Sequence, residues 1–366
     1  MNMNLNTGLI GLPMVGKTTI FNLLTGSGAE TSKFLTGKTE TNVGAARVPD
    51  RRMNFLINLF RPKKTAYAQI QFSDVPGLVR GSSQGKGVGN QFLNAIRNAD
   101  MLVQVVRAFE NPDVQHVDGS IDPFRDIETV NMELLFADME IIEKRIERIK
   151  GAKKVKKENA LELSVMEKCL AALENEVAIS RLELSEEERQ VLKNFSFLTE
   201  KPMLLVINTD EGQFKGKSYP GKESLGVFAA GKGLPVIEIC GRMEMEITML
   251  PEEDRELFLS DLGVTQSGID RLARAAYDYL GLMSFFTVGE DEVKAWTINR
   301  GTEARRAAGK IHSDIERGFI KAEVVKYPEI ERLGSMAKVK EAGLFRLEGK
   351  EYIVEDGDII NFRFNV

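Results

Sequence analysis

Consecutive residues near the start of the sequence carry the clearest chemical signal. They fit the phosphate-binding pattern G-x-x-x-x-G-K-[ST] and read Gly11-Leu12-Pro13-Met14-Val15-Gly16-Lys17-Thr18. The glycines allow backbone N–H groups to curl around a phosphate group. The amine of Lys17 can then reach the β- and γ-phosphates, and the hydroxyl of Thr18 can bind Mg²⁺. The stretch therefore predicts a site for a nucleoside triphosphate, in which Lys17 stabilises phosphate charge.

A second stretch, Ser73-Asp74-Val75-Pro76-Gly77, supplies the acidic residue that such a site needs. An aspartate at a strand end would lie beside the Mg²⁺, and Gly77 would respond to the γ-phosphate. Leu78 follows, where Ras-type enzymes place a glutamine that orients water. Because leucine cannot orient water, hydrolysis must use another polar group or stay slow until a partner supplies one. The glycine-rich segment 81–89 either orders on nucleotide binding or is a plain flexible loop.

Two further loops hold candidate residues. A threonine in the Thr-, Ser-, Gly- and Lys-rich segment 25–45 would close over Mg²⁺, and spacing alone does not choose between Thr36, Thr39 and Thr41. A surface loop without ligand contact is the alternative. His116 is a candidate general base or water positioner, although a solvated loop histidine is the commoner case.

The base of the nucleotide is expected at Asn208-Thr209-Asp210-Glu211, which follows an apolar strand. P-loop GTPases carry the motif N-K-x-D at this position, and its aspartate accepts hydrogen bonds from guanine. Glu211 moves the carboxylate by about one methylene, which a site built for paired hydrogen bonds tolerates badly. The variant thus favours adenine over guanine. The loop from Cys240 to Met243 would border the base, and we expect Cys240 to be an inert thiol rather than a redox-sensitive one.

The elements that must position these residues follow an alternating strand and helix pattern. Five strands are predicted from short apolar or alternating runs at 5–10, 66–72, 101–106, 202–207 and 235–239. A helix is expected directly after Thr18. From about Asp126, apolar residues recur at heptad spacing in two runs, which predicts an antiparallel helical hairpin with a basic tip at Lys150 to Lys157. Ser185 to Glu188 is a capping box that begins another helix.

In about the last 80 residues the pattern of predicted strands and helices changes, which predicts a compact α+β module. Strands are expected at 284–288 and 295–298, and a helix at 304–312. Runs at 351–354 and 359–362 flank a predicted turn, Asp356-Gly357-Asp358.

Composition sets broad limits on the class of protein. The chain has 366 residues, 43% hydrophobic and 28% charged, which fits a soluble protein of two or three domains. It has neither an 18-residue apolar run nor a secretion signal, so we expect a cytoplasmic location and no membrane contact. Cys169 and Cys240 match no metal spacing and are expected to be reduced. A net charge of −5 argues against global, charge-driven binding of nucleic acid.

Taken together, these motifs resemble the YchF family of Obg-like ATPases over essentially the whole chain. The resemblance is carried by the residues at 11–18, 74–78 with the glycine-rich tail, 208–211, and 295–297 through 309–312 to 352–358. It implies an α/β P-loop NTPase G domain at 1–125 and 198–283, a helical coiled-coil insertion at 126–197, and an α+β TGS domain of β-grasp type at 284–366. It also implies ATP preference, ribosome association and a catalytic role for His116.

The sequence departs from that family at specific residues. Met14 replaces the usual asparagine of the phosphate loop, so a monovalent cation held by that asparagine is not expected. Lys38 stands where the Mg²⁺-closing threonine would align, and Thr36 or Thr39 would have to substitute after a shift. Cys240-Gly241-Arg242 replaces the more usual Ser-Ala type of base loop.

The leading hypothesis is therefore a slow, Mg²⁺-dependent ATPase switch that is monomeric and acts on the ribosome, with RNA contact through the Lys150 to Lys157 tip and the TGS domain as a further expectation. Lys17 and His116 are the predicted catalytic residues, and Thr18, Asp74 and Thr39 the metal ligands. The predicted nucleotide contacts are Gly11, Leu12, Pro13, Met14, Val15, Gly16, Lys17, Thr18, Thr19, Gly77, Asn208, Thr209, Glu211, Cys240 and Gly241. The alternatives are a GTPase with relaxed base choice and a nucleotide-sensing scaffold or chaperone-like module with negligible turnover.

Overall fold

A computed structural model describes residues 5–29, 41–78, 81, 88–151 and 157–365. Contacts within the chain divide it into two compact units. One comprises residues 5–44 and 71–271, and the other comprises 1–4, 45–70 and 272–366. Among the described residues, no helix is long and apolar enough to cross a membrane.

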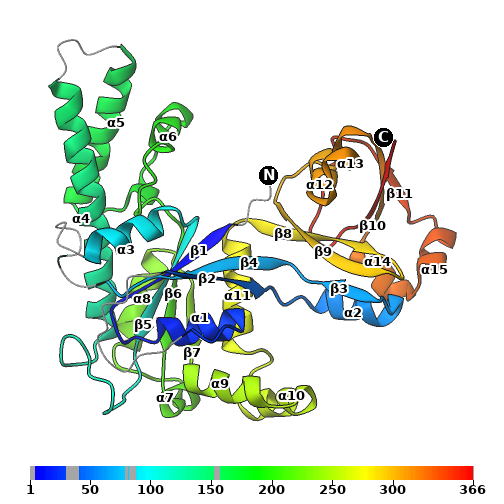
Figure 1. Ribbon diagram of the computed structural model, residues 1–366, viewed down its shortest axis with the longest axis horizontal. Coiled ribbons are helices and arrows are strands. Elements are labelled where there is room, and N and C mark those ends of the chain that lie inside the picture. Colours follow the sequence, from blue (N-terminus) through cyan, green and yellow to red (C-terminus); the bar gives the residue numbers. More distant parts are fainter. Residues whose placement is uncertain (1–4, 30–40, 79–80, 82–87, 152–156, 366) are drawn as a thin grey trace. The chain divides into compact units, whose positions relative to one another are not determined.

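A six-stranded sheet forms the centre of the larger unit, in the order β2-β4-β1-β5-β6-β7 (Figure 1). Its strands are β1 (Asn6–Ile10), β2 (Asn42–Arg47), β4 (Gln69–Asp74), β5 (Met101–Arg107), β6 (Met203–Asn208) and β7 (Val236–Ile239). The pairs β1 with β4, β1 with β5, β5 with β6, and β6 with β7 are all parallel. Every residue of β5 is buried, and so is every residue of β6 except the first. Their sequences are mostly apolar for this reason, as expected for parallel strands that are covered on both faces.

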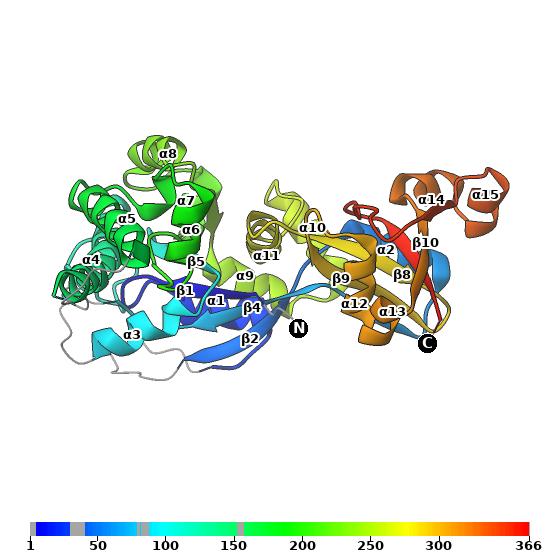
Figure 2. The same ribbon diagram turned by 90° about the horizontal axis from the view of Figure 1, so that it is seen from above.

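Helices on both faces bury this sheet, with α1 and α8 on opposite sides (Figures 1 and 2). Residues of α8 pack with side chains of β5 and β6, among them Val106, Leu205, Ile207 and Leu225. The helices of this unit are α1 (Lys17–Thr25), α3 (Val88–Arg97), α4 (Pro123–Lys150), α5 (Lys157–Glu174), α6 (Glu186–Leu192), α7 (Glu211–Gly216), α8 (Lys222–Gly231), α9 (Gly241–Met249) and α10 (Glu252–Asp261). The doubly covered parallel sheet confirms the predicted α/β class.

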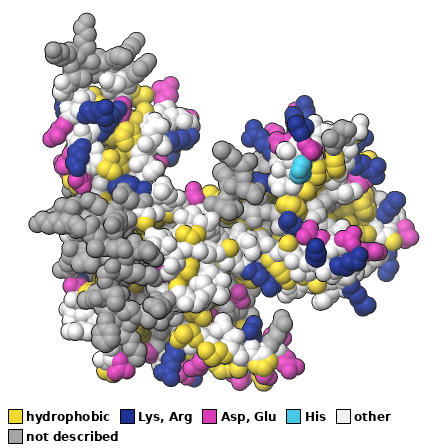
Figure 3. Space-filling model, viewed as in Figure 1, with side chains coloured by type: hydrophobic (Ala, Val, Ile, Leu, Met, Phe, Trp, Pro, Cys, Tyr) yellow, Lys and Arg dark blue, Asp and Glu magenta, His cyan; other side chains and the backbone are white. Residues whose placement is uncertain are grey.

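The predicted helical hairpin is present as α4 and α5, which extend away from the sheet (Figure 1). Its interior holds Ile142, Ile146, Met166 and Cys169, close to the heptad spacing that predicted it. Figure 3 shows hydrophobic side chains running along the hairpin between charged ones of both signs. The predicted capping box also forms, since Ser185 and Glu188 each cap the other's backbone N–H at the start of α6. Part of the basic tip, 152–156, lies outside the described residues.

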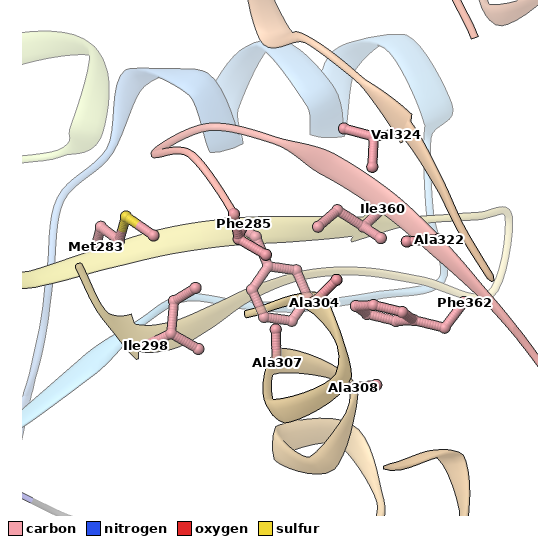
Figure 4. Packing of buried hydrophobic residues seen from close by; sticks show 11 residues of the cluster. Met283, Phe285, Ile298, Ala304, Ala307, Ala308, Ala322, Val324, Ile360 and Phe362 are labelled. Atoms are coloured by element: carbon pink, nitrogen blue, oxygen red, sulfur yellow. The ribbon is translucent and has the colours of Figure 1, made fainter. Parts of the chain in front are cut away.

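The second unit is built on another six-stranded sheet, in the order β11-β10-β12-β8-β9-β3. Its strands are β3 (Lys64–Ala66), β8 (Leu282–Val288), β9 (Glu292–Asn299), β10 (Phe319–Val325), β11 (Arg346–Glu348) and β12 (Ile359–Phe364). Its helices are α2 (Arg51–Phe60), α12 (Ala304–Ile311), α13 (Ser313–Arg317), α14 (Tyr327–Leu333) and α15 (Met336–Glu341), and α11 (Gly268–Tyr279) leads into it from the larger unit. Small residues of α12, Ala304, Ala307 and Ala308, bring the helix close to Phe285 and Phe362 (Figure 4).

The predicted turn at Asp356-Gly357-Asp358 is present directly before β12. Residues 351–354 form no strand, and β12 instead pairs antiparallel with β10 and parallel with β8. The turn also faces basic side chains from elsewhere in the chain. Asp356 pairs with Arg52 of α2, 2.9 Å away, and Asp358 pairs with Lys326 at 2.8 Å.

The segment 45–70 packs with the C-terminal unit, which the predicted domain limits did not anticipate. β3 runs parallel to β9, and the ring of Phe55 on α2 meets the ring of Tyr327 edge-on at 5.8 Å. Arg52 also forms an ion pair with Asp50. Burial has the largest single effect on the pKa of Arg52 and lowers it, but Asp50 and Asp356 together outweigh burial, so the pKa is raised. The TGS assignment itself stays a prediction.

Candidate functional site

The phosphate-binding pattern occupies the turn between β1 and α1, at the carboxyl edge of the parallel sheet. Gly11 has a φ of 146°, and a Cβ there would lie 2.3 Å from the carbonyl oxygen of Val105. Gly16 has a φ of 96°, and a Cβ there would lie 2.4 Å from Nδ2 of Asn208. Both positions therefore need glycine for backbone conformation and for space. Met14 also adopts a left-handed conformation, with a φ of 63°.

Lys17 is the first residue of α1 and is only 7% exposed. Its amine donates hydrogen bonds to the carbonyl oxygens of Leu12, at 2.8 Å, and Gly11, at 3.1 Å. The loop thus curls around its own lysine at the positive end of the helix dipole. This is the arrangement that binds an anion in nucleotide-binding loops.

Thr18 and Asp74 meet, although 55 residues separate them in the sequence. The hydroxyl of Thr18 donates to Oδ2 of Asp74 at 2.9 Å, and the carboxylate is 2% exposed at the end of β4. A hydroxyl and a carboxylate are hard oxygen donors, which Mg²⁺ prefers. These two residues therefore fit the metal that the sequence predicted, and the remaining predicted ligand, Thr39, lies outside the described residues.

Gly77 packs against the phosphate-binding loop. A Cβ at this position would lie 2.9 Å from Cγ of Pro13 and 3.0 Å from its backbone nitrogen. The N–H of Leu78 donates to the carbonyl oxygen of Gly11 at 3.0 Å, and its side chain is fully buried. The side chain of Leu78 therefore contributes to packing, at the position where Ras-type enzymes carry a side chain that orients water.

Asn208 joins the phosphate-binding loop to the predicted base site. Its Nδ2 donates to the carbonyl oxygen of Val15 at 3.0 Å, and its Oδ1 accepts from the N–H of Gly241 at 3.2 Å. The side chain is 5% exposed at the end of β6. Thr19 of α1 lies on the same side, since a Cβ on Gly241 would stand 3.8 Å from its Cγ2.

The other predicted base residues take different environments. Thr209 is buried and its hydroxyl donates to the carbonyl oxygen of Ile239 at 3.3 Å. Glu211 begins α7 with an exposed carboxylate that accepts from Lys215 at 2.6 Å, a hydrogen bond that lowers the pKa of Glu211. Cys240 is 2% exposed, and burial raises the pKa of its thiol, which suits the predicted inert role. The predicted loop from Cys240 to Met243 is wrong, because α9 begins at Gly241.

His116 lies in the loop between β5 and α4 and is 7% exposed, so it is not the solvated histidine of the alternative interpretation. Its Nε2 lies 2.8 Å from Oδ2 of Asp126, and its Nδ1 accepts from the N–H of Asp118 at 3.1 Å. Both ring nitrogens are therefore engaged within the loop and the first turn of α4.

Comparisons with known proteins place the chain in a family. A family model described as a 50S ribosome-binding GTPase matches residues 6–138, and a second model, YchF-GTPase_C, described as a protein of unknown function, matches 282–365. The chain is 46% identical over its full length to the full length of "Ribosome-binding ATPase YchF" of Bacillus subtilis, and 42% identical to the protein of that name from Escherichia coli O157:H7. The chain belongs to the YchF family. A solved structure, the Schizosaccharomyces pombe YchF GTPase, matches with a TM-score of 0.85 at 31% identity and covers 98% of each chain.

Sequence reasoning missed two charged residues that organise the YchF-family loop around His116. Arg107, the last residue of β5, is 2% exposed and donates to main-chain carbonyls of the loop. Asp126, at the start of α4, is 2% exposed and binds the histidine. Charged residues are rarely this buried unless they are paired, but a single sequence does not reveal which ones are buried.

We predict that Asn208→Ala destabilises this YchF-family protein by about 1–3 kcal/mol, because it leaves a buried carbonyl and a buried N–H without their partner. Nucleotide affinity should fall as well, since the phosphate-binding loop loses its tie to Gly241. Urea unfolding measures the first effect and calorimetric titration the second. Asn98→Ala, at an exposed position after α3, is the control and should change stability by less than about 0.5 kcal/mol. Equal effects from both variants would contradict the structural role assigned to the hydrogen bonds of Asn208 with Val15 and Gly241.

Proposed function

We propose that this protein is a ribosome-associated, Mg²⁺-dependent ATPase switch in which nucleotide binds over the turn between β1 and α1. The observation that carries the proposal is the meeting of Lys17, Thr18 and Asp74 at the start of α1. The relatives named ribosome-binding ATPase support the partner and the reaction. A cytoplasmic location and a monomeric state remain part of the proposal.

The phosphates would be held by the backbone N–H groups of residues 11–16 and by Lys17. The Lys17 amine would exchange the carbonyl oxygens of Gly11 and Leu12 for phosphate oxygens, which bear more negative charge. Thr18 and Asp74 would hold Mg²⁺, which neutralises charge between the β- and γ-phosphates when bound. Gly77 would sense the γ-phosphate from its place against Pro13.

Positioning of the attacking water falls to His116 in this proposal, because the side chain of Leu78 has no polar atom. A histidine side chain can accept a proton or orient water near neutral pH. In the described conformation both of its nitrogens are engaged, so slow basal turnover is expected.

Base choice is assigned to Asn208, Thr209, Glu211, Cys240 and Gly241. We infer a preference for adenine, because Glu211 replaces the aspartate that would accept from guanine. RNA contact through the Lys150 to Lys157 tip and a TGS role for the C-terminal unit complete the proposal.

Calorimetric titration of the nucleotide-free protein with non-hydrolysable ATP and GTP analogues in Mg²⁺ buffer tests the assignment. We expect ATP to bind at least tenfold more tightly, a difference of about 1.4 kcal/mol. Glu211→Asp should raise GTP affinity and narrow that ratio. Equal or GTP-favoured binding by the unaltered protein would instead favour a GTPase with relaxed base choice.

A second candidate is a nucleotide-sensing scaffold with negligible turnover. The burial of Leu78 at the water-orienting position favours it. Measured ATP hydrolysis separates the two: turnover no faster than that of Lys17→Ala, together with retained ATP binding, would support the scaffold.

A further inference from the structure

The loop that carries His116 is fixed at its start by the buried arginine at the end of β5. The Nε of Arg107 donates to the carbonyl oxygen of Phe109 at 3.1 Å. One terminal nitrogen donates to the carbonyl oxygens of Val114, at 2.9 Å, and Asn111, at 3.4 Å. The guanidinium also lies 4.4 Å from the ring centre of Phe109. Hydrogen bonds from the end of β5 thus hold the first half of the loop, up to Val114.

The ring of His116 is locked in one tautomer. The N–H of Asp118 donates to Nδ1, so Nδ1 has no proton and its lone pair is used. Nε2 must then carry the proton and donate it to Asp126, 2.8 Å away. Neither nitrogen can accept a proton from water in this state. A histidine that is to position or deprotonate water must first give up one of these contacts.

Asp126 is well placed to hold this state. Its Oδ2 accepts from His116, and its Oδ1 accepts two hydrogen bonds from Arg125, at 2.8 and 3.1 Å. The carboxyl group is therefore oriented and buried in the first turn of α4, where a helix dipole favours negative charge.

The same three groups, His116, Asp118 and Asp126, lie close enough to suggest a metal site. Arg125 argues against that interpretation. Its guanidinium contacts Asp126 and lies 3.7 Å from Asp118, so a positive charge already occupies the position between the carboxylates. The cluster is a network of hydrogen bonds and ion pairs in which Arg125 and Asp126 surround the histidine.

We propose that Asp126 is a positioning residue that stores His116 in a form unable to accept a proton, so that nucleotide hydrolysis requires the contact between them to break. The proposal rests on the function proposed above, in which His116 positions the attacking water. In the opposite arrangement, a carboxylate orients a working histidine, and its removal lowers the rate. That arrangement needs a free lone pair on the second nitrogen, which the N–H of Asp118 occupies here.

The test is the steady-state ATPase activity of Asp126→Ala, compared with the unaltered full-length protein. We expect a several-fold higher kcat with KM little changed, because the histidine is released while the phosphate site is untouched. Asp126→Asn keeps an acceptor without the charge and should give a smaller increase in the same direction. Asp113→Ala removes an exposed carboxylate from the same loop and should leave the rate unchanged.

The double variant Asp126→Ala with His116→Ala tests whether the gain passes through the histidine. We expect it to fall to the rate of His116→Ala alone. An unchanged or lower kcat in both Asp126 variants would overturn the proposal, and so would a gain that survives the loss of His116. If the unaltered protein hydrolyses ATP no faster than Lys17→Ala, the proposed function fails first and this proposal fails with it.

A readout independent of activity is available because the chain has only two histidines, His116 and His312. Nitrogen NMR of the imidazole rings, with His312→Gln to assign the signals, reports the tautomer of each ring. We expect the Nε2–H tautomer for His116 in the nucleotide-free protein and a mixture of tautomers in Asp126→Ala. A tautomer mixture already present in the unaltered protein would overturn the storage role even if the ATPase assignment held.

Discussion

Replacing Lys17 by alanine should abolish ATP hydrolysis and weaken nucleotide binding by about a hundredfold or more. Lys17 is 7% exposed, and its amine is held by two carbonyl oxygens of the loop in which the phosphates are proposed to bind. Each charge-assisted hydrogen bond to a phosphate contributes about 1.5–3 kcal/mol, and about 2.7 kcal/mol corresponds to a hundredfold change in affinity. Calorimetric titration with a non-hydrolysable ATP analogue and steady-state phosphate release measure the two effects.

Lys144→Ala is the matched control, since this lysine of α4 has a side chain that is 70% exposed. It should leave ATP affinity unchanged. Lys17→Arg should also fail to restore hydrolysis, because the planar guanidinium does not reproduce a compact ammonium in a loop this tight. Circular dichroism on heating would confirm that the variants remain folded. ATP affinity within threefold of normal in a folded Lys17→Ala protein would place the nucleotide elsewhere.

The phosphate half of the site could be predicted from the sequence because its chemistry is nearly contiguous. The glycine spacing, Lys17 and Thr18 lie within one turn, and two positive φ angles of that turn fall on glycines, Gly11 and Gly16, that the sequence itself shows. The position of Asp74 close to Thr18 could be predicted as well, because the carboxyl ends of neighbouring parallel strands meet at one edge of the sheet. Local rules were sufficient to predict that these candidate residues meet, while their binding of nucleotide and Mg²⁺ stays a prediction.

The loop around His116 could not be predicted in the same way. Its order depends on Arg107, whose partners are backbone carbonyls that any sequence would supply, and on a burial that only the folded chain defines. Nor does spacing reveal that Asp126 faces the loop rather than solvent. Sequence reasoning found the histidine but not the residues that restrain it.

The assignment of 45–70 to the C-terminal unit shows a second limit. α2 and β3 look like ordinary parts of an alternating strand and helix pattern, yet β3 pairs with β9 and Arg52 binds Asp356, 304 residues away. The turn at Asp356-Gly357-Asp358 could be predicted as a turn, but its long-range ion pairs could not. Its two carboxylates pair with Arg52 and Lys326, which no local turn signal reveals.

The largest effect on stability is expected from Phe285→Ala in the C-terminal unit. Phe285 is fully buried in β8, meets Phe362 edge-on at 5.9 Å and stacks on Trp296 at 6.3 Å between ring centres (Figure 4 shows the surrounding core). Truncation removes the ring contacts and leaves a cavity beneath α12, which costs about 3–5 kcal/mol in cores of this kind. Urea unfolding followed by the fluorescence of Trp296, the chain's only tryptophan, reports this unit directly.

Leu347→Ala is the control for Phe285→Ala, because Leu347 lies in the same unit on β11 and is 61% exposed. Its removal should cost less than about 0.5 kcal/mol. Phe285→Leu keeps most of the volume and should fall between the two. The change in fluorescence intensity that accompanies loss of the stacked ring affects only the baselines, so the midpoint of the transition decides the outcome. A midpoint for Phe285→Ala no lower than that of Leu347→Ala would mean that the packing between β8, β12 and α12 does not limit the stability of this unit.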